Sequence, residues 1–253
     1  MARATYKDAE HVLNRMRGCG YVPEAREYEN LLKAVASSTK YGHGDLSDSE
    51  RAFDHFTAAG GKPGLLHYNL VLESASWSAY WKLRKASNSE TAGGVVEHSA
   101  EWGNRTWTVL SRYLDKMQEE KIECDCSSVT LCASVAKHCG LQGAVVRTWQ
   151  MFRNIQPKLR SSALYTEMIA ALGSVGNSEA AFGLLGVASK HKFRPTSEMT
   201  AAALATCKTA GEAEEMLRKI EAMGAVIPAD AASIVARLAS LALEADGSLG
   251  ANQ

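Results

Sequence analysis

Apolar residues recur along the chain at positions i, i+3, i+4 and i+7, which places them on one face of an α-helix. Ala9, Val12, Leu13 and Met16 form one such set. Equivalent sets begin at Leu110, Ala181 and Ala213. A shorter pattern, in which one residue is followed by an apolar pair at i+3 and i+4, begins at Tyr28, Tyr68, Val129 and Tyr165. No segment alternates with period two for long enough to predict a strand, so the chain is predicted to be all-α.

Prolines divide these helical segments into units of similar length. The chain has only five, and each follows one amphipathic segment and precedes the next: Pro23, Pro63, Pro157, Pro195 and Pro228. With Cys124 counted as a sixth boundary, the successive intervals are 40, 61, 33, 38 and 33 residues. A period in the low to middle thirties predicts an α-solenoid of helix pairs, in which each pair buries its apolar faces only against its neighbours.

We therefore expect one domain over residues 1–253, built from a half-repeat and five repeats. An insertion at 77–103 lengthens the second repeat between its two helices. The predicted units are 5–24, 25–64, 65–125, 126–158, 159–196 and 197–229, followed by a helix at 230–243 and a short tail at 244–253.

The composition narrows the possible partners and compartments. Lys and Arg together number 28, as do Asp and Glu, so nucleic-acid binding requires a local patch rather than overall charge. No apolar run is long enough to cross a membrane, and we expect a soluble chain that does not bind one. Six cysteines are too sparse for a disulfide scaffold and favour a reducing compartment.

Sequence motifs for catalysis are missing. The chain has no phosphate-binding Gly-Lys loop, no dinucleotide-binding glycine motif, no His-Glu-x-x-His and no Gly-x-Ser-x-Gly. Four cysteines at 124, 126, 132 and 139 lack the paired spacing of structural zinc sites. Cys132 and Cys139 lie seven residues apart on one predicted helix face, where a small apolar side chain packs well. We expect no enzyme activity, no cofactor or metal, and no small-molecule substrate.

The helix pairs resemble those of the pentatricopeptide repeat family. The resemblance rests on Tyr68-Asn69 at the start of a first helix, on the Gly20 to Pro23 close, and on the Gly-then-Ala turns at 140–144 and 176–181. It covers about residues 5 to 243. The competing tetratricopeptide repeat has a Trp-x-x-Leu-Gly-x-x-Tyr signature that this sequence lacks. The family resemblance implies a right-handed α-solenoid whose first helices line the concave side.

Members of this family bind single-stranded RNA in mitochondria and chloroplasts, one base per repeat. The resemblance assigns the base-reading pair to the residue after the first-helix aromatic position and to the last residue of the repeat. Only Asn69 with Asp125 resembles an orthodox, uridine-reading pair. The insertion between these two residues could hold them too far apart to contact one base. The other pairs are Glu29 with Gly64, Thr130 with Lys158, Thr166 with Thr196, and Ala201 with Ala229.

Two further groups of residues are candidate contacts. The Trp-rich insertion and its basic run predict a docking surface for protein or RNA; its members are Trp77, Trp81, Arg84, Lys85 and Trp102. The alternative is that Trp77 and Trp81 extend a buried helix face, with a solvated Ser/Glu/Gly loop beyond them. Lys137 and Lys208 are candidate phosphate contacts, or else solvated helix ends.

Together these features predict a noncatalytic, RNA-associated adaptor. Degenerate, neutral arrays of this kind resemble those built into large organellar assemblies, and we expect a structural subunit of a mitochondrial ribosome or a related RNA-processing assembly. Its partners would be RNA and protein subunits, in the mitochondrial matrix, although no Arg-rich presequence is present. The alternatives are a protein scaffold that has lost RNA binding and a free factor that matures one transcript.

Overall fold

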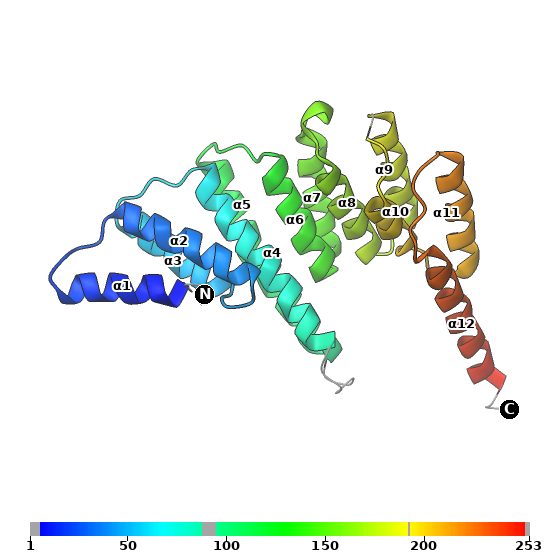
Figure 1. Ribbon diagram of the computed structural model, residues 1–253, viewed down its shortest axis with the longest axis horizontal. Helices are drawn as coiled ribbons and strands as arrows, with labels where there is room; N and C mark the ends of the chain where they lie inside the picture. Colours follow the sequence, from blue (N-terminus) through cyan, green and yellow to red (C-terminus); the bar gives the residue numbers. More distant parts are fainter. Residues whose placement is uncertain (1–5, 88–94, 192, 251–253) are drawn as a thin grey trace. The chain divides into compact units, whose positions relative to one another are not determined.

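The computed structural model describes residues 6–87, 95–191 and 193–250, and within these ranges it is helical without strands (Figure 1). The helices are α1 (Tyr6–Gly18), α2 (Ala25–Lys40), α3 (Leu46–Ala58), α4 (Leu65–Ser87), α5 (Val95–Glu119), α6 (Cys126–Cys139), α7 (Gln142–Asn154), the 3-10 helix η1 (Pro157–Leu159), α8 (Ser162–Ser174), α9 (Ser178–Lys190), α10 (Ser197–Leu204), α11 (Ala210–Ala222) and α12 (Ala231–Gly250). The all-α prediction is confirmed.

The predicted repeats coincide with these helix pairs. First helices begin at residues 25, 65, 126, 162 and 197, against predicted repeat starts of 25, 65, 126, 159 and 197. In the fourth repeat the first helix begins three residues later than predicted, because the short 3-10 helix η1 precedes α8. Pro157 is well suited to the first position of a helix, but this helical turn ends at Leu159. Helix α12 runs to Gly250 rather than 243, because Leu241 to Ala245 are mostly strong helix formers.

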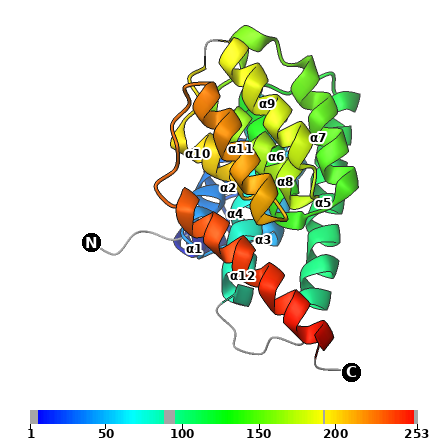
Figure 2. The ribbon, with the colours of Figure 1, turned by 90° about the vertical axis from the view of Figure 1, so that its right-hand side faces the viewer.

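The helices fall into two compact units, Met1–Cys139 and Gly140–Gln253. In the first unit, the first helices α2 and α6 both pack against α4, and α3 and α5 cover this row from their own pairs (Figure 1). In the second unit, α8 packs against α9 and α10, and α12 covers α10 and α11 (Figure 2). The prediction of one continuous domain stays a prediction.

Aromatic side chains join successive helix pairs in the first unit. Tyr68 of α4 is fully buried, with its ring centroid 5.2 Å from that of Phe53 on α3. Phe53 in turn lies 5.2 Å, edge to face, from Tyr113 on α5. Edge-to-face packing of this kind contributes beyond the burial of area. The three rings therefore hold α3, α4 and α5 together.

The second unit repeats this arrangement. The buried ring of Tyr165 on α8 packs edge to face against Phe152 on α7, with centroids 5.6 Å apart. Its hydroxyl forms a 2.8 Å hydrogen bond with Nδ1 of His191, just after α9. The tyrosine at the predicted first-helix position is thus a core residue in both units, as the apolar pattern indicated.

The insertion extends two helices. Residues 77–87 continue α4 and residues 95–103 begin α5, so both helices exceed twenty residues. The Ser/Glu/Gly stretch that was expected to form a loop lies at 88–94, outside the described residues. Within the described part, the insertion lengthens the helix pair and leaves the repeat boundaries at 65 and 125 in place.

A leucine-to-alanine substitution on α4 should lower the free energy of unfolding much more at a buried position than at an exposed one. Leu72 is fully buried, whereas Leu66 is 53% exposed. Leu72→Ala should lower the free energy of unfolding by about 2–5 kcal/mol, because it leaves a cavity between packed helices. Leu66→Ala is the matched control and should change it by less than about 0.5 kcal/mol. Urea denaturation followed by circular dichroism measures both, and equal losses would contradict the described packing.

Candidate nucleic-acid interface

The structure brings together the one predicted pair that resembles an orthodox base reader. Nδ2 of Asn69 on α4 donates to Oδ1 of Asp125 at 3.4 Å, across 56 residues of sequence. Ser128 completes the group: its hydroxyl lies 2.7 Å from Oδ1 of Asn69 and 2.8 Å from Oδ1 of Asp125. The insertion therefore does not separate Asn69 from Asp125.

Asp125 is held in place by the start of α6. Its Oδ1 accepts the backbone N–H of Ser128 at 2.8 Å, as an N-cap residue does, and the Asp125 N–H points back to the Ser128 hydroxyl at 3.3 Å. Burial raises the pKa of Asp125, but the hydrogen bonds from Ser128 and Asn69 outweigh burial and keep the pKa below its ordinary value. The group presents a fixed carboxylate beside a fixed amide.

Glu29 is already engaged in contacts within the chain. Its carboxylate pairs with Lys33 at 2.5 Å and lies 3.8 Å from Nε2 of His67 on α4. The hydrogen bond from Lys33 is the main cause of the lowered pKa of Glu29. His67 is anchored in turn, because its ring stacks on Phe56 and its Nδ1 accepts the Gly64 N–H at 3.0 Å. In the predicted Glu29–Gly64 pair, Glu29 is therefore engaged in an ion pair with Lys33 of the same helix.

The threonine positions use their hydroxyls locally. Thr130 donates to the Cys126 carbonyl at 2.7 Å, and Thr166 donates to the Ser162 carbonyl at 3.1 Å. Thr196 caps α10 by accepting the Met199 N–H at 3.3 Å. Each hydroxyl oxygen retains capacity to accept a further hydrogen bond. Pairing of Thr166 with Thr196 stays a prediction.

The lysine candidates lie at turns and helix ends. Lys158 is exposed on η1, in the second compact unit, whereas its predicted partner Thr130 belongs to the first. Lys208 is also exposed, and a Cβ added at Gly176 would lie 3.1 Å from its ammonium nitrogen. Lys137 is half-buried in the last turn of α6, where a cation interacts favourably with the helix dipole. Phosphate contact by these side chains stays a prediction.

Two tryptophans of the insertion, Trp77 and Trp81, contact the end of α2 and the turn that follows it. Nε1 of Trp81 donates to the Lys40 carbonyl at 3.2 Å, and a Cβ on Gly42 would lie 3.4 Å from the indole. The Lys40 ammonium lies 5.8 Å from the Trp77 ring centroid. Trp77 and Trp81 are half-buried and pack against this end of α2 and the turn that follows it.

The remaining residues of the predicted docking surface differ in the contacts that they make within the chain. The Arg84 guanidinium lies 5.4 Å from the Trp81 ring centroid and donates to the Tyr80 hydroxyl at 3.2 Å. The Lys82 ammonium lies 5.2 Å from the Trp102 ring centroid. Lys85 is exposed. Docking of a partner on these residues stays a prediction, and substitution of Trp81 is expected to affect the α2–α3 turn as well.

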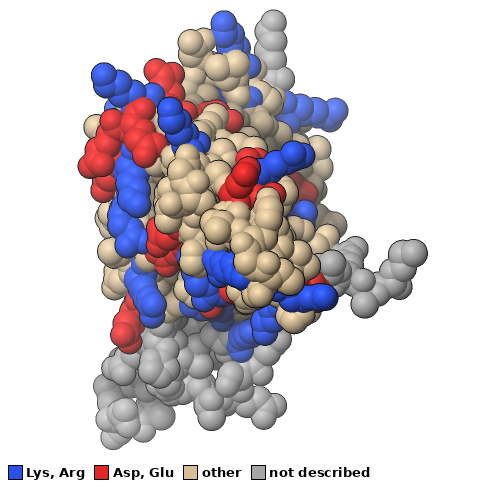
Figure 3. Space-filling view, turned by 90° about the vertical axis from the view of Figure 1, so that its left-hand side faces the viewer, with Lys and Arg blue, Asp and Glu red and all other residues tan. Residues whose placement is uncertain are grey.

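Charges of both signs are mixed on the molecular surface. On the face shown in Figure 3, Lys and Arg side chains lie among Asp and Glu side chains instead of forming a continuous basic stripe. Contact with a polyanion would therefore depend on individual side chains on that face.

Sequence reasoning missed two partners of the predicted pairs. Ser128 and His67 each stand three residues after a predicted last-repeat residue, Asp125 and Gly64 respectively. That spacing is the signal of a helix start, and it was available in the sequence.

Solved structures of a pentatricopeptide repeat protein are among those to which this chain is similar. With the crystal structure of PPR10 from maize the TM-score is 0.46 at 20% identity, over 91% of this chain and 34% of that one. With PPR10 in complex with an 18-nt psaJ RNA element, the TM-score is 0.40 at 15% identity, over 92% and 40%. The chain spans between a third and two fifths of the length of PPR10.

No family model matches the sequence. No curated protein matches it either. Among the described residues, no group of three His, Cys, Asp or Glu side chains is placed to hold a metal ion. No helix in that part of the chain is both long and apolar enough to span a membrane.

His138, beside Lys137 at the end of α6, is held neutral. Burial, together with the charge of Lys137, lowers the pKa of His138 to about 4. In the unfolded chain the imidazole titrates near its ordinary pKa of about 6.5. Between these values the unfolded state binds more protons than the folded state, so stability falls as pH falls through this range.

His138→Gln should therefore weaken the acid sensitivity of the protein. The free energy of unfolding of the wild type should decrease more steeply from pH 6.5 to 4 than that of the variant, as measured by urea denaturation at several pH values. His11→Gln, at an exposed position on α1, should keep the steep wild-type slope. Identical slopes for wild type and His138→Gln would show that this imidazole is charged in the folded protein.

Proposed function

We propose that this chain is a noncatalytic, RNA-associated adaptor of pentatricopeptide repeat type. The observation that carries the proposal is the contact between Asn69 and Asp125, which the sequence resemblance assigns to base recognition. Two polar side chains 56 residues apart meet beside the start of α6, although an insertion separates them in the sequence. The solved structure of PPR10 with an RNA element is in keeping with this proposal.

The chemistry of the pair suits a uracil edge. One N–H of the Asn69 amide points to Asp125, and the second has no partner among the described residues, so it is available to a carbonyl oxygen of the base. The carboxylate of Asp125 stays ionised and accepts hydrogen bonds, which suits the N3–H of uracil. Single-stranded bases are recognised through such edges.

The other predicted pairs favour association within an assembly over recognition of a long RNA. Glu29 forms an ion pair with Lys33, and Ala201 and Ala229 carry no polar side-chain group. The chain also has no net charge, so long-range attraction to RNA is small. We therefore favour a structural subunit of a mitochondrial ribosome or a related RNA-processing assembly, located in the mitochondrial matrix, in which protein contacts supply much of the affinity.

A second candidate function is a protein scaffold without RNA binding. It is favoured by the same group of residues, because Asp125 caps α6 and Asn69 bridges α4 to α6, and both roles are sufficient to explain the contact. The two functions differ in whether RNA binding depends on the uncommitted polar atoms of the pair.

Substitution of the pair should weaken binding to uridine-rich RNA. Asn69→Ala removes one or two hydrogen bonds and should reduce affinity for a short oligouridine about 3–10-fold, with a smaller effect on oligoadenosine. Asp125→Asn keeps a good N-cap residue but removes the charge, so uridine preference should fall while the melting temperature changes little. Fluorescence anisotropy with the full chain measures both affinities.

Glu198→Gln is the matched control for Asp125→Asn. It removes one carboxylate charge from the exposed first turn of α10, outside every predicted pair, and should leave RNA binding unchanged. If neither pair variant changes the affinity, the scaffold function is favoured and base recognition by this pair is wrong.

Membership of an RNA-containing assembly can be tested directly. In a sucrose gradient of organelle lysate, we expect the chain to migrate with a ribosomal subunit or a particle of similar size and to leave that fraction after RNase treatment. Comigration with an RNase-resistant complex that contains no RNA would support the scaffold. Migration as a free protein that binds one transcript tightly would support the third alternative, a transcript-maturation factor.

A further inference from the structure

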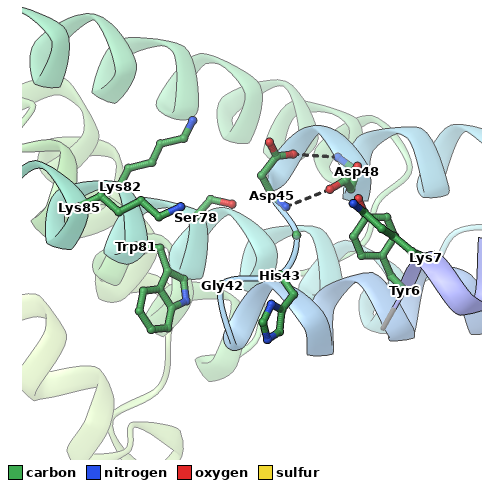
Figure 4. A pocket seen from close by; sticks show the side chains of 11 residues that line it. Tyr6, Lys7, Gly42, His43, Asp45, Asp48, Ser78, Trp81, Lys82 and Lys85 are labelled. Carbon is green, nitrogen blue, oxygen red and sulfur yellow. Dashed lines mark hydrogen bonds between the residues drawn. The ribbon is translucent and has the colours of Figure 1, made fainter. Parts of the chain in front are cut away.

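A cavity of about 270 Å³ lies in the first compact unit, between the start of α1, the α2–α3 turn and the inserted part of α4 (Figure 4). Three lysines line it, Lys7 from α1 and Lys82 and Lys85 from α4. Ser78, Lys82 and Lys85 stand at i, i+4 and i+7, so they share one face of the helix. The insertion thus supplies most of the polar side chains on this wall.

The cations of the cavity outnumber its carboxylates. Asp45 and Asp48 are the two acidic groups that line it, and within the part of the chain that the structure describes neither forms an ion pair with Lys7, Lys82 or Lys85. Partial burial lowers the pKa of Lys82, and the charges of Arg105 and Lys85 act in the same direction, whereas the nearby Asp45 carboxylate opposes both effects. An anion in the cavity would relieve both effects.

The two carboxylates are engaged in capping α3. Oδ1 of Asp45 accepts the N–H groups of Ser47 and Asp48, at 2.9 and 3.2 Å, while Oδ2 of Asp48 accepts the Asp45 N–H at 3.1 Å (Figure 4). Oδ1 of Asp48 pairs with Arg51 at 2.8 Å. Oδ1 of Asp45 and both oxygens of Asp48 are therefore directed at the helix start and at Arg51, while Oδ2 of Asp45 and the lysine ammonium groups are not used in this capping.

Ser78 provides an independent indication of a ligand. Its side chain lines the cavity, the residue is only 4% exposed, and its buried hydroxyl has no hydrogen-bond partner among the described residues. A buried polar atom without a partner costs free energy, and such atoms are rare in folded proteins. In Figure 4 the Lys85 side chain points along α4 toward this hydroxyl.

We propose that this cavity binds a phosphate group, with Ser78, Lys82 and Lys85 as its principal donors and Lys7 at its rim. A phosphate carries several acceptor oxygens and up to two negative charges, which suits the Lys85 ammonium directed at the Ser78 hydroxyl in a cavity that two further lysines line. A cation would be repelled by the three ammonium groups, and a neutral ligand would leave their positive charge uncompensated. The volume exceeds that of a phosphate alone, which leaves space for part of a group attached to the phosphate.

The phosphate can come from a free ion, a mononucleotide or the 5′ end of an RNA strand, and titration calorimetry with the full chain distinguishes these sources. The probes are sodium phosphate, adenosine monophosphate, adenosine, and a short RNA with either a 5′-phosphate or a 5′-hydroxyl. We expect saturable binding of phosphate and of the monophosphate, weaker binding at higher salt, and none of adenosine. A preference for the 5′-phosphorylated RNA would identify a strand end as the ligand.

Three variants test the residues. Lys85→Gln should weaken phosphate binding about tenfold, because it removes one charge-assisted hydrogen bond. Ser78→Ala should weaken binding several-fold while the melting temperature stays the same or rises, since the methyl group replaces an unpaired buried hydroxyl. Lys62→Gln, at an exposed position before α4, removes a charge elsewhere and should bind like the wild type.

The melting temperature of Ser78→Ala separates a ligand site from a structural hydroxyl. A lower melting temperature with unchanged phosphate affinity would overturn the proposal, as would the absence of saturable phosphate binding or equal binding of adenosine and its monophosphate. The proposal is independent of base recognition at Asn69 and Asp125. Loss of the uridine preference in those variants, with phosphate binding intact, would distinguish the two sites.

Discussion

The fold depends on a constraint that each helix shares with its neighbours: its apolar face is too wide to be buried within one helix pair, so the next pair must cover the rest of it. The tyrosines of the first helices satisfy this requirement. Tyr68 packs on Phe53 of the preceding pair, and Tyr165 packs on Phe152. Because these contacts join consecutive pairs, they also fix which polar residues of neighbouring first helices come within reach of each other.

The first-helix polar residues show this dependence most clearly. Asn69 follows the buried Tyr68 by one position, so the packing of that ring sets where the amide lies. Glu29 follows Tyr28 in the same way and reaches His67 on the next first helix. A candidate RNA interface of this kind is a consequence of core packing, and its geometry is as rigid as the stack beneath it.

Much of the fold could be predicted from the sequence because its signals are local. Prolines, glycines and the 3.6-residue period mark helix ends and buried faces, and they located the starts of α2, α4, α6 and α10. The end of α12 and the helical state of residues 77–87 were harder, because no proline marks either limit. There, helix propensity and tertiary contacts with the α2–α3 turn decide the outcome.

The candidate sites could be predicted only in part, since they depend on contacts between distant segments. Asn69 and Asp125 were identified as a pair through the family resemblance, but the role of Ser128 as the side chain that joins them required the structure. The cavity beside Ser78 was not predictable at all. It requires the start of α1, the turn at Gly42 and the extended α4 to meet, and no periodicity encodes that meeting.

The position of the insertion has a consequence for how such a repeat can change. The added residues lengthen α4 and α5 at the end where the two helices of one pair are joined, whereas Tyr68 and Asn69 lie near the start of α4 and Asp125 follows the end of α5. Growth at that end leaves the spacing between neighbouring pairs untouched. A repeat array can therefore acquire new surface, including a wall of lysines and tryptophans, while its stacking register is inherited unchanged.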